Sequence, residues 1–300
     1  MCIRDRLDSD AYSWMQERIT PETLVIGDPA VYDNLDDLVP LPLADLAEQV
    51  GEKIYASAVA CGFVVGLLGL ESVSLERTLK EMFGSNQEVL DKNLHASSLG
   101  LERGEAAATE KEWVCHLQAD PQVAGQLFLN GSQAVGLGAI AGGCNFIASY
   151  PMSPSTGVLQ FLAKYAEQFG LVVEQAEDEI SAINMGLGSW YAGGRAMVST
   201  SGGGFALMGE GLSLAGGIES PMVIHLAQRP GPATGLPTRT EQGDLDLALY
   251  AGHGEFPRMI LAPGTLEEAF ECARLAFDLA DASQSPVFIL TDQYLSLIHI

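Results

Sequence analysis

The stretch "RAMVSTSGGGFALMGEGLSLAGGIESPMVIHLAQRP", Arg195 to Pro230, decides the fold. Its first part, "RAMVSTSGGG", is expected to be a buried strand followed by a glycine turn. "FALMGEGLSLAGGIE" then predicts a helix, and "SPMVIHLAQRP" a second buried strand. Two buried strands joined by one helix are typical of a parallel sheet, because a parallel connection has to cross over the sheet.

The same alternation continues on both sides of this stretch. Further strands are expected at "FIASYP" (146–151), "LVVEQ" (171–175) and "PVFILTDQYL" (286–295). Further helices are expected at "NGSQAVGLGAIAGGC" (130–144), "STGVLQFLAKYAEQFG" (155–170, ended by Gly170), the segment after Asp178, and "TLEEAFECARLAFDLADASQ" (265–284). We therefore predict an α/β fold with a doubly wound parallel sheet over residues 127–295.

Ligands of such sheets bind at the carboxyl ends of the strands. The candidate site is therefore expected in the loops after Tyr150, Gln175, Ser199 and Leu226.

A smaller domain is expected ahead of this sheet, over residues 7–99. "TLVIGDPA" (23–30) reads as a strand, "LPLADLAEQVG" (41–51) as a helix, and residues 53–96 as helical hairpins broken at Gly69 and Gly84. The most apolar run, "ASAVACGFVVGLLGL" (56–70), is too short for a bilayer span of about 20 residues and is expected to be a buried helix. Residues 100–126 begin with "GLERGEAAATEKEW" and read as a linker. Residues 1–6 and 296–300 fit no neighbouring pattern and are expected to be non-native.

Charge and cysteine content exclude several classes of function. Thirty-nine acidic residues against 15 basic ones give a net charge of −24, which argues against nucleic acid and anionic membranes as partners. The five cysteines include no CxxC pair, so an iron–sulfur or zinc site is not expected within this chain. Scattered thiols, and the lack of a signal peptide, favour a reducing compartment, the cytoplasm. His116, His225 and His253 have no triad-like neighbours and are expected to be structural or peripheral.

"EQAEDEISAINMGLGSWYAGG" (174–194) places four acids ahead of an uncharged helix that is rich in small residues. Asp178 is a natural N-cap, and acids are favoured in a first helical turn, so the cluster can be a helix start and nothing more. The small residues reduce helix propensity, which makes sense where the backbone approaches another surface or a ligand. Both interpretations stay open on spacing alone.

"SYPMSPSTG" (149–157) follows a strand and holds Ser153 between two prolines, which fix the backbone. It is either a loop that presents a hydroxyl or a plain N-cap turn. "HLAQRPGPATGLPTRTEQGDL" (225–245) places Arg229 at a strand end before a rigid loop, where an arginine can bind a carboxylate or phosphate with two hydrogen bonds. "TSGGGF" (200–205) lacks the lysine of a phosphate loop and is weak evidence for one.

Together these motifs resemble the α subunit of 2-oxoacid:ferredoxin oxidoreductases, most closely the 2-oxoglutarate type. The resemblance is carried over residues 128–295 by "GLGAIAGGC", "YPMSPST", "QAEDEISAINMGLGSWYAG", "STSGGGFALMGEGLSLAGGIE", "QRPGPATGLPTRTEQGDL", "YAGHGEFPRMILAPG" and "DQYL". Residues 20–100 resemble the C-terminal part of a γ domain, which many members carry fused ahead of α. The glycine-rich opening of that domain is not found in this sequence, so the resemblance does not decide whether the γ part binds coenzyme A.

The resemblance implies that residues 127–295 bind the pyrimidine half of thiamine diphosphate. A carboxylate would pair with a ring nitrogen of the aminopyrimidine and so activate the cofactor; by motif position this is Glu179, with Glu177 second. Tyr150, Pro151, Ser201 and Gly202 are expected to contact the cofactor. Ser153 stands where the family usually has threonine and would donate to the 2-oxoacid. Arg229 would pair with the 1-carboxylate of the substrate, and Thr238 and Arg239 would face a distal carboxylate.

The resemblance also implies a β subunit that carries Mg²⁺ and a 4Fe–4S cluster, with ferredoxin and coenzyme A as further partners, in an (αβ)₂ assembly. A pyruvate or branched-chain 2-oxoacid enzyme remains an alternative within the family. A non-catalytic scaffold or regulatory subunit of the same fold is the alternative from another class.

Overall fold

A computed structural model describes residues 16–20, 23–32, 38–114, 117, 120–123 and 125–298 of the 300-residue chain, Ile298 by its backbone only. The chain forms two compact units, Met1–Ala124 and Gly125–Ile300, each with its own hydrophobic core. Residues 1–6, Cys115 and His116, on which the sequence analysis made predictions, lie outside the described residues.

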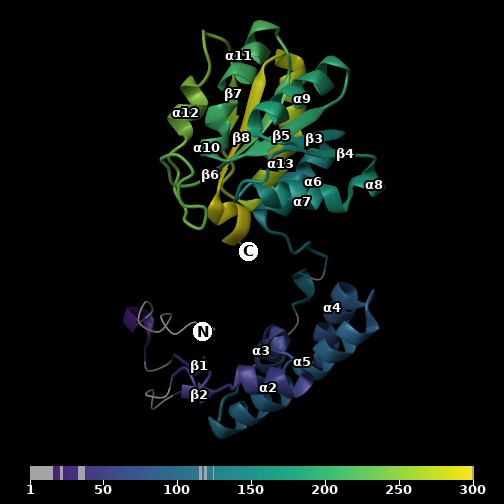
Figure 1. Ribbon diagram of the computed structural model, residues 1–300, viewed down its shortest axis with the longest axis vertical. Helices are drawn as coiled ribbons and strands as arrows, with labels where there is room; N and C mark the ends of the chain where they lie inside the picture. Colours follow the sequence, from purple (N-terminus) through teal and green to yellow (C-terminus); the bar gives the residue numbers. More distant parts are fainter. Residues whose placement is uncertain are drawn as a thin grey trace. The chain divides into compact units, whose positions relative to one another are not determined.

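The first unit is mainly helical, with one pair of short parallel strands (Figure 1). Its elements are η1 (Gln16–Arg18), β1 (Val25–Gly27), β2 (Leu38–Pro40), α2 (Leu43–Val50), η2 (Lys53–Tyr55), α3 (Ala56–Leu67), α4 (Ser72–Phe83), α5 (Gln87–Glu110) and η3 (Pro121–Val123). The expected strand, the helix ending at Gly51 and the helical hairpins are all present.

Residues 100–110, which the sequence predicts as the start of a linker, are instead the second half of helix α5, so this part of the prediction is wrong. The backbones of α3 and α5 lie in direct contact: a Cβ on Gly100 would overlap the carbonyl oxygen of Val59, and one on Gly104 that of Phe63. Small residues on α5 therefore form a packed helix face, although the segment has few large apolar side chains to signal it. The division between the units falls later, at Ala124.

Helix α3 is buried against its own unit, as the sequence predicts for the most apolar run. None of the helices in the described ranges is by itself long and apolar enough to cross a membrane. Only α2 and the η2–α3 segment taken together reach the required length and composition, and they are bent by 118° where they join.

The second unit is built on one six-stranded sheet in the order β4-β3-β5-β6-β8-β7, with every pair parallel. The strands are β3 (Phe146–Ser149), β4 (Val172–Gln175), β5 (Ala196–Thr200), β6 (Met222–Gln228), β7 (Met259–Leu261) and β8 (Pro286–Asp292). The helices are α6 (Gly131–Ala141), α7 (Thr156–Lys164), α8 (Ala166–Phe169), α9 (Glu179–Tyr191), α10 (Gly202–Leu207), α11 (Gly209–Gly217), α12 (Leu245–Tyr250), α13 (Leu266–Ser283) and the π-helical turn η4 (Tyr294–Ile298).

Helices cover the sheet on both faces, which confirms the predicted doubly wound fold (Figure 1). α6, α7 and α13 pack together, and α9, α10 and α11 form a second group. This division follows from the strand order, because right-handed crossovers that run in opposite directions along a sheet lie on opposite faces. Every residue of β5 and β6 is buried, as expected for central parallel strands.

Local signals in the sequence set the helix boundaries. Asn130 and Gln133 form a capping box at the start of α6, and the side chain of Thr265 accepts a hydrogen bond from the backbone N–H of Glu268 at the start of α13. Gly170 adopts the left-handed conformation (φ 66°) that ends α8. One expectation is wrong: the glycine run after β5 is the first turn of helix α10 and not a separate turn.

Candidate active site

The carboxyl ends of β3, β5 and β6 lie side by side and carry most of the expected site residues. β3 and β5 are neighbours in the sheet, although β4 lies between them in sequence, so the connections diverge at this point. Such a switch point leaves a crevice between loops that run in opposite directions, where ligands of doubly wound sheets bind.

Glu179 lies at this edge as the first residue of α9 and is only 3% exposed. Its Oε1 is buried and accepts no hydrogen bond from any residue that the structure describes. Asp178 caps the helix, since its side chain accepts the backbone N–H of Ser181 at 2.7 Å, and Glu177 is exposed. A buried acceptor without a donor costs about 1–3 kcal/mol, so this carboxylate is suited to a donor from a bound molecule.

The first turn of α10, Gly202–Gly204, provides the space for this carboxylate. A Cβ on Gly204 would overlap Oε1 of Glu179 and Oγ1 of Thr200. A Cβ on Gly203 would lie 2.8 Å from the carbonyl oxygen of Ala233. We refer to Gly202–Gly204 as the glycine turn; its lack of side chains lets oxygen atoms from other segments approach the backbone of α10.

Arg229 follows β6 directly and is 7% exposed. Its guanidinium donates to the carbonyl oxygens of Ser153 and Thr234, both at 2.6 Å. Burial lowers the pKa of Arg229, and the charges of Asp244 and Glu179 oppose this shift. No described carboxylate lies within 4.0 Å of the guanidinium, so the group retains N–H donors for an anion.

The other cations around the second sheet are occupied or exposed. Arg195 pairs with Asp278 and Asp281, Arg274 pairs with Glu271, Arg258 donates to the carbonyls of Ala248 and Ala251, Lys164 lies over the ring of Tyr165, and Arg239 is exposed. Among the described residues of this unit, Arg229 is therefore the buried cation best placed to bind an anionic ligand.

Ser153 and Ser201 meet at Arg229. The carbonyl oxygen of Ser153 accepts the Arg229 hydrogen bond and a second one from Oγ of Ser201 at 2.9 Å. Ser153 itself is exposed, Tyr150 is 41% exposed, and Pro151 is partly buried. The loop after β3, the start of α10 and the end of β6 are thus joined through one carbonyl group.

Two expected substrate contacts are not brought into this group. Thr238 and Arg239 are both exposed, in the loop between β6 and α12. The backbone N–H of Arg239 donates to the carbonyl of Leu236 at 3.1 Å, and its side chain is exposed. The structure therefore gives Thr238 and Arg239 no contact with Arg229 or Glu179.

A buried hydrogen-bonded line crosses the sheet beneath the site. Nδ1 of His225 lies 2.8 Å from Oγ of Ser199, and Nε2 lies 2.9 Å from Oγ1 of Thr291. The backbone N–H of Ser199 donates to Oγ of Ser149 at 3.0 Å. Burial lowers the pKa of His225 to about 4, so the ring is neutral at physiological pH. This line links β3, β5, β6 and β8.

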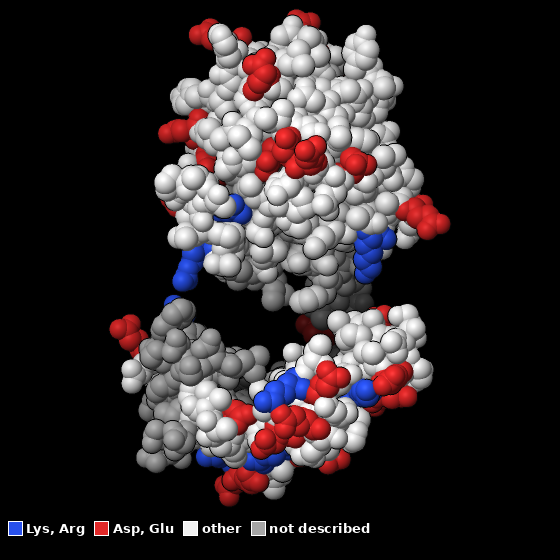
Figure 2. All heavy atoms as spheres, in the orientation of Figure 1, with Lys and Arg blue, Asp and Glu red and all other residues white. Residues whose placement is uncertain are grey.

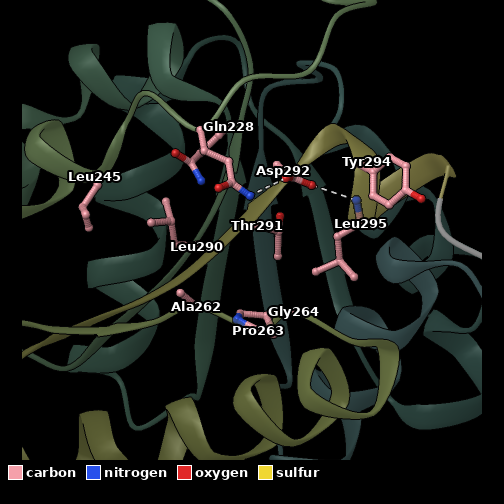
Figure 3. A pocket seen from close by; sticks show the side chains of 11 residues that line it. Gln228, Leu245, Ala262, Pro263, Gly264, Leu290, Thr291, Asp292, Tyr294 and Leu295 are labelled. Carbon is pink, nitrogen blue, oxygen red and sulfur yellow. Dashed lines mark hydrogen bonds between the residues drawn. The ribbon is translucent and has the colours of Figure 1, made fainter.

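A cavity of about 430 Å³ lies at the carboxyl ends of β6 and β8, where Thr291 of the buried hydrogen-bonded line forms part of its lining. Figure 3 shows Gln228 and Asp292 on one side of it and Ala262, Pro263 and Gly264 on the other. Its size is in the range of small-molecule sites. None of the residues expected to bind cofactor or substrate lines this cavity.

The surface around the second sheet is acidic: Figure 2 shows acidic side chains over the drawn face of this unit and few basic ones. Within the described ranges, no group of three or more His, Cys, Asp or Glu residues is arranged to hold a metal ion.

Sequence reasoning missed two residues of the site, Gly204 and Asp244. Asp244 packs on Gly202, where a Cβ would overlap both of its carboxylate oxygens, and its Oδ2 is buried without a hydrogen-bond partner among the described residues. Within "TSGGGF" the sequence singles out Ser201 and Gly202 but not Gly204, and Asp244 lies in the long motif after Arg229 without a role of its own. Three glycines in succession where a helix begins were the available signal, because this sequence is costly in a helix unless close packing requires it.

Comparison with known protein families agrees with the predicted resemblance. Residues 137–297, more than half of the chain, match the family model described as pyruvate flavodoxin/ferredoxin oxidoreductase, thiamine diphosphate-binding. Residues 6–103 match the model described as pyruvate ferredoxin/flavodoxin oxidoreductase.

Individual relatives are also subunits of enzymes that act on 2-oxoacids. The chain is 37% identical over 252 residues to the α subunit of 2-oxoacid:ferredoxin oxidoreductase 1 of Aeropyrum pernix, covering 81% of this chain and 39% of the relative. It is 42% identical over 165 residues to the 2-oxoglutarate synthase subunit KorA of Archaeoglobus fulgidus, covering 55% of this chain and 48% of the relative. The chain therefore spans less than half the length of these relatives.

A solved structure is similar over nearly the whole chain. It is the 2-oxoglutarate:ferredoxin oxidoreductase from Magnetococcus marinus with 2-oxoglutarate, coenzyme A and succinyl-CoA bound. The TM-score is 0.78 and the identity 34%, over 96% of this chain and 51% of that one.

Proposed function

Because this chain belongs to the pyruvate flavodoxin/ferredoxin oxidoreductase family, we propose that it acts as the α subunit, with part of a γ domain fused ahead of it, of a 2-oxoglutarate:ferredoxin oxidoreductase. The reaction would convert 2-oxoglutarate, coenzyme A and oxidised ferredoxin to succinyl-CoA, CO₂ and reduced ferredoxin. The names of the Archaeoglobus relative and of the Magnetococcus structure support 2-oxoglutarate as the substrate.

One observation carries this proposal: the buried Oε1 of Glu179, which has no donor among the described residues. The proposed cofactor, thiamine diphosphate, has an aminopyrimidine ring whose protonated ring nitrogen can supply such a donor. Gly204 keeps the space beside the carboxylate open, and Glu177 is exposed, so burial favours Glu179 for the role. The residues present therefore fit this group.

Thiamine diphosphate, when bound, supplies the carbon nucleophile that attacks a 2-oxoacid. The residues of this chain would orient the substrate and polarise the cofactor. Glu179 would hold a proton shared with the pyrimidine nitrogen, in surroundings that exclude water. Arg229 would bind the 1-carboxylate through its remaining N–H groups and so orient it for loss as CO₂. The hydroxyl of Ser153, next to the carbonyl that anchors Arg229, would donate to the substrate.

Other components would come from a separate β subunit: the residues that hold the diphosphate, Mg²⁺ and the 4Fe–4S cluster, and the surface that binds ferredoxin. The relatives named as α subunits support such an assembly, and an (αβ)₂ arrangement is the one we propose. The free thiols of Cys61, Cys144 and Cys272 are consistent with the cytoplasmic location that the sequence suggests.

The test is a pair of matched substitutions, Glu179→Gln and Glu177→Gln, in enzyme assembled by co-expression with the β partner. Each substitution removes one carboxylate charge, and the two positions are only two residues apart. We expect Glu179→Gln to lower kcat by at least about 100-fold without loss of assembly, because the amide cannot hold the shared proton. Glu177→Gln should stay within about two-fold of the unmodified enzyme. Near-normal turnover of Glu179→Gln would remove Glu179 from the mechanism.

A further inference from the structure

Asp244 has an unusual position for its residue type. It stands at the N-cap of α12, where an aspartate normally accepts a backbone N–H of its own helix. Here its side chain makes no capping hydrogen bond. Oδ2 is buried and has no hydrogen-bond partner among the described residues. The ordinary structural role of an aspartate at a helix start therefore does not account for this carboxylate.

The carboxylate faces the glycine turn and Arg229 instead. A Cβ on Gly202 would overlap both carboxylate oxygens, so only glycine leaves room for them. Burial raises the pKa of Asp244, and a hydrogen bond from the backbone N–H of Arg229 opposes that shift. The backbone N–H of Asp244 donates to Oε1 of Gln228 at 3.0 Å, which ties it to the end of β6.

Asp244 and Glu179 are arranged in a similar way around the glycine turn. Asp244 packs on Gly202, and Glu179 packs on Gly204. Each has one buried oxygen without a partner in the described part of the chain. Both act on Arg229 through their charge, in the direction that keeps its guanidinium protonated. One buried cation is thus influenced by two carboxylates before any anionic ligand binds.

We propose that Asp244 is a positioning residue that sets the affinity of Arg229 for an anionic ligand. Its backbone N–H ties this loop to Gln228 at the end of β6, next to Arg229, and its negative charge offsets part of the attraction between the guanidinium and an incoming carboxylate. In a partly buried site this charge is screened less than it would be at the surface. Moderate affinity suits a carboxylate that has to leave as CO₂, because tight binding of the ground state does not accelerate the reaction. This inference rests on the proposed function of Arg229.

The experiment measures binding of 2-oxoglutarate to the full chain by ligand-observed NMR titration, with the thermal unfolding of each variant as a folding control. Asp244→Asn removes the charge and keeps the shape. We expect its Kd to fall about five-fold, because one opposing charge near the cation is lost. The matched control is Asp246→Asn, which removes an exposed carboxylate two residues later; the Kd of this variant should change by less than about two-fold.

The direction of the change separates this role from a purely structural one, since disruption of the site would raise Kd. An unchanged or raised Kd in a folded Asp244→Asn protein overturns the proposal. If that variant does not fold, Asp244→Ser, which also removes the charge, makes the same comparison. Arg229→Ala tests the underlying function separately: a Kd for Arg229→Ala equal to that of the unmodified chain means that Arg229 is not the anion site.

Discussion

At the scale of single residues, a buried guanidinium without an acid within ion-pair distance is an expensive feature. The desolvation of Arg229 is offset only in part by the carbonyls of Ser153 and Thr234. Arg195, another hydrogen-bonded arginine of the second unit, is more exposed and pairs with two aspartates. Arg195 fastens α13 and the end of α6 to the start of β5 and is satisfied by the fold, whereas Arg229 has donors left over.

Arg229→Ala should raise KM for the 2-oxoacid by roughly 30- to 100-fold, the loss expected for a charge-assisted pair. KM for coenzyme A should change by less than about three-fold, because coenzyme A does not use this carboxylate contact. Steady-state kinetics of the assembled enzyme give both values. Arg229→Lys serves as the conservative variant. Its KM for the 2-oxoacid should lie between those of the unmodified enzyme and Arg229→Ala, since lysine keeps the charge and loses the planar donor geometry. Equal increases in the two KM values would identify Arg229 as a folding residue.

At the scale of elements, the glycine turn explains why a poor helix sequence begins a helix. Each of its three glycines faces an oxygen of another segment: Asp244, Ala233 and Glu179 in turn. A side chain at Gly202 or Gly204 would remove a carboxylate from its place. The helix is thus held by tertiary contacts, against a propensity cost of up to about 1 kcal/mol for each glycine.

Gly204→Ala should destabilise the isolated chain by about 1–3 kcal/mol, because the added methyl must displace Glu179 or Thr200. Gly188 in α9 is the matched control, since a Cβ there meets nothing within 4 Å. Gly188→Ala should stabilise the chain by about 0.5–1 kcal/mol through helix propensity alone. Urea unfolding followed by circular dichroism measures both. A stable Gly204→Ala protein would mean that the carboxylate is not packed on this glycine.

How much of this could be predicted depends on where the information lies. β5, β6 and β8 were predictable because long apolar runs are a local signal. β7 and α12 were not predicted: β7 has three half-buried residues at the sheet edge, which is too short for a periodic pattern. The linker prediction failed because the contact between α3 and α5 is made by backbone at glycines and not by large apolar side chains.

For the candidate site, the sequence indicates residue types but not geometry. Motif position ranks Glu179 ahead of Glu177 without excluding Glu177, and the structure distinguishes them by burial: Glu179 is buried beside Gly204 of α10, whereas Glu177 is exposed. The role of Asp244 was hidden for the same reason, since it depends on Gly202 and Arg229 in two other segments. Motif resemblance located these segments, but only the packing of the sheet brings them together.

At the scale of the whole second unit, the buried line through His225 joins four strands of one sheet. The hydroxyls of Ser199 and Thr291 bond the two nitrogens of the neutral imidazole, and the backbone N–H of Ser199 extends the line to the hydroxyl of Ser149, all at buried positions. Such a line is favourable only while the ring stays neutral, because a buried charge without an acidic partner is costly. His225 therefore couples the stability of the unit to pH.

The chain should lose about 3 kcal/mol of stability from the His225 effect as the pH falls from 6.5 to about 4. The pKa of His225 is lower in the folded chain than in the unfolded chain, where it is 6.5. Between these two values the unfolded chain binds a proton at His225 and the folded chain does not, which favours unfolding. The contribution is complete above pH 6.5 and is lost as the pH falls towards the folded pKa. Urea unfolding at several pH values measures it, and the loss should shrink in His225→Gln. His253 is an exposed histidine of the same unit, and His253→Gln should keep the full pH dependence of the free energy of unfolding. If this free energy changes equally with pH in the two variants, His225 does not couple folding to pH.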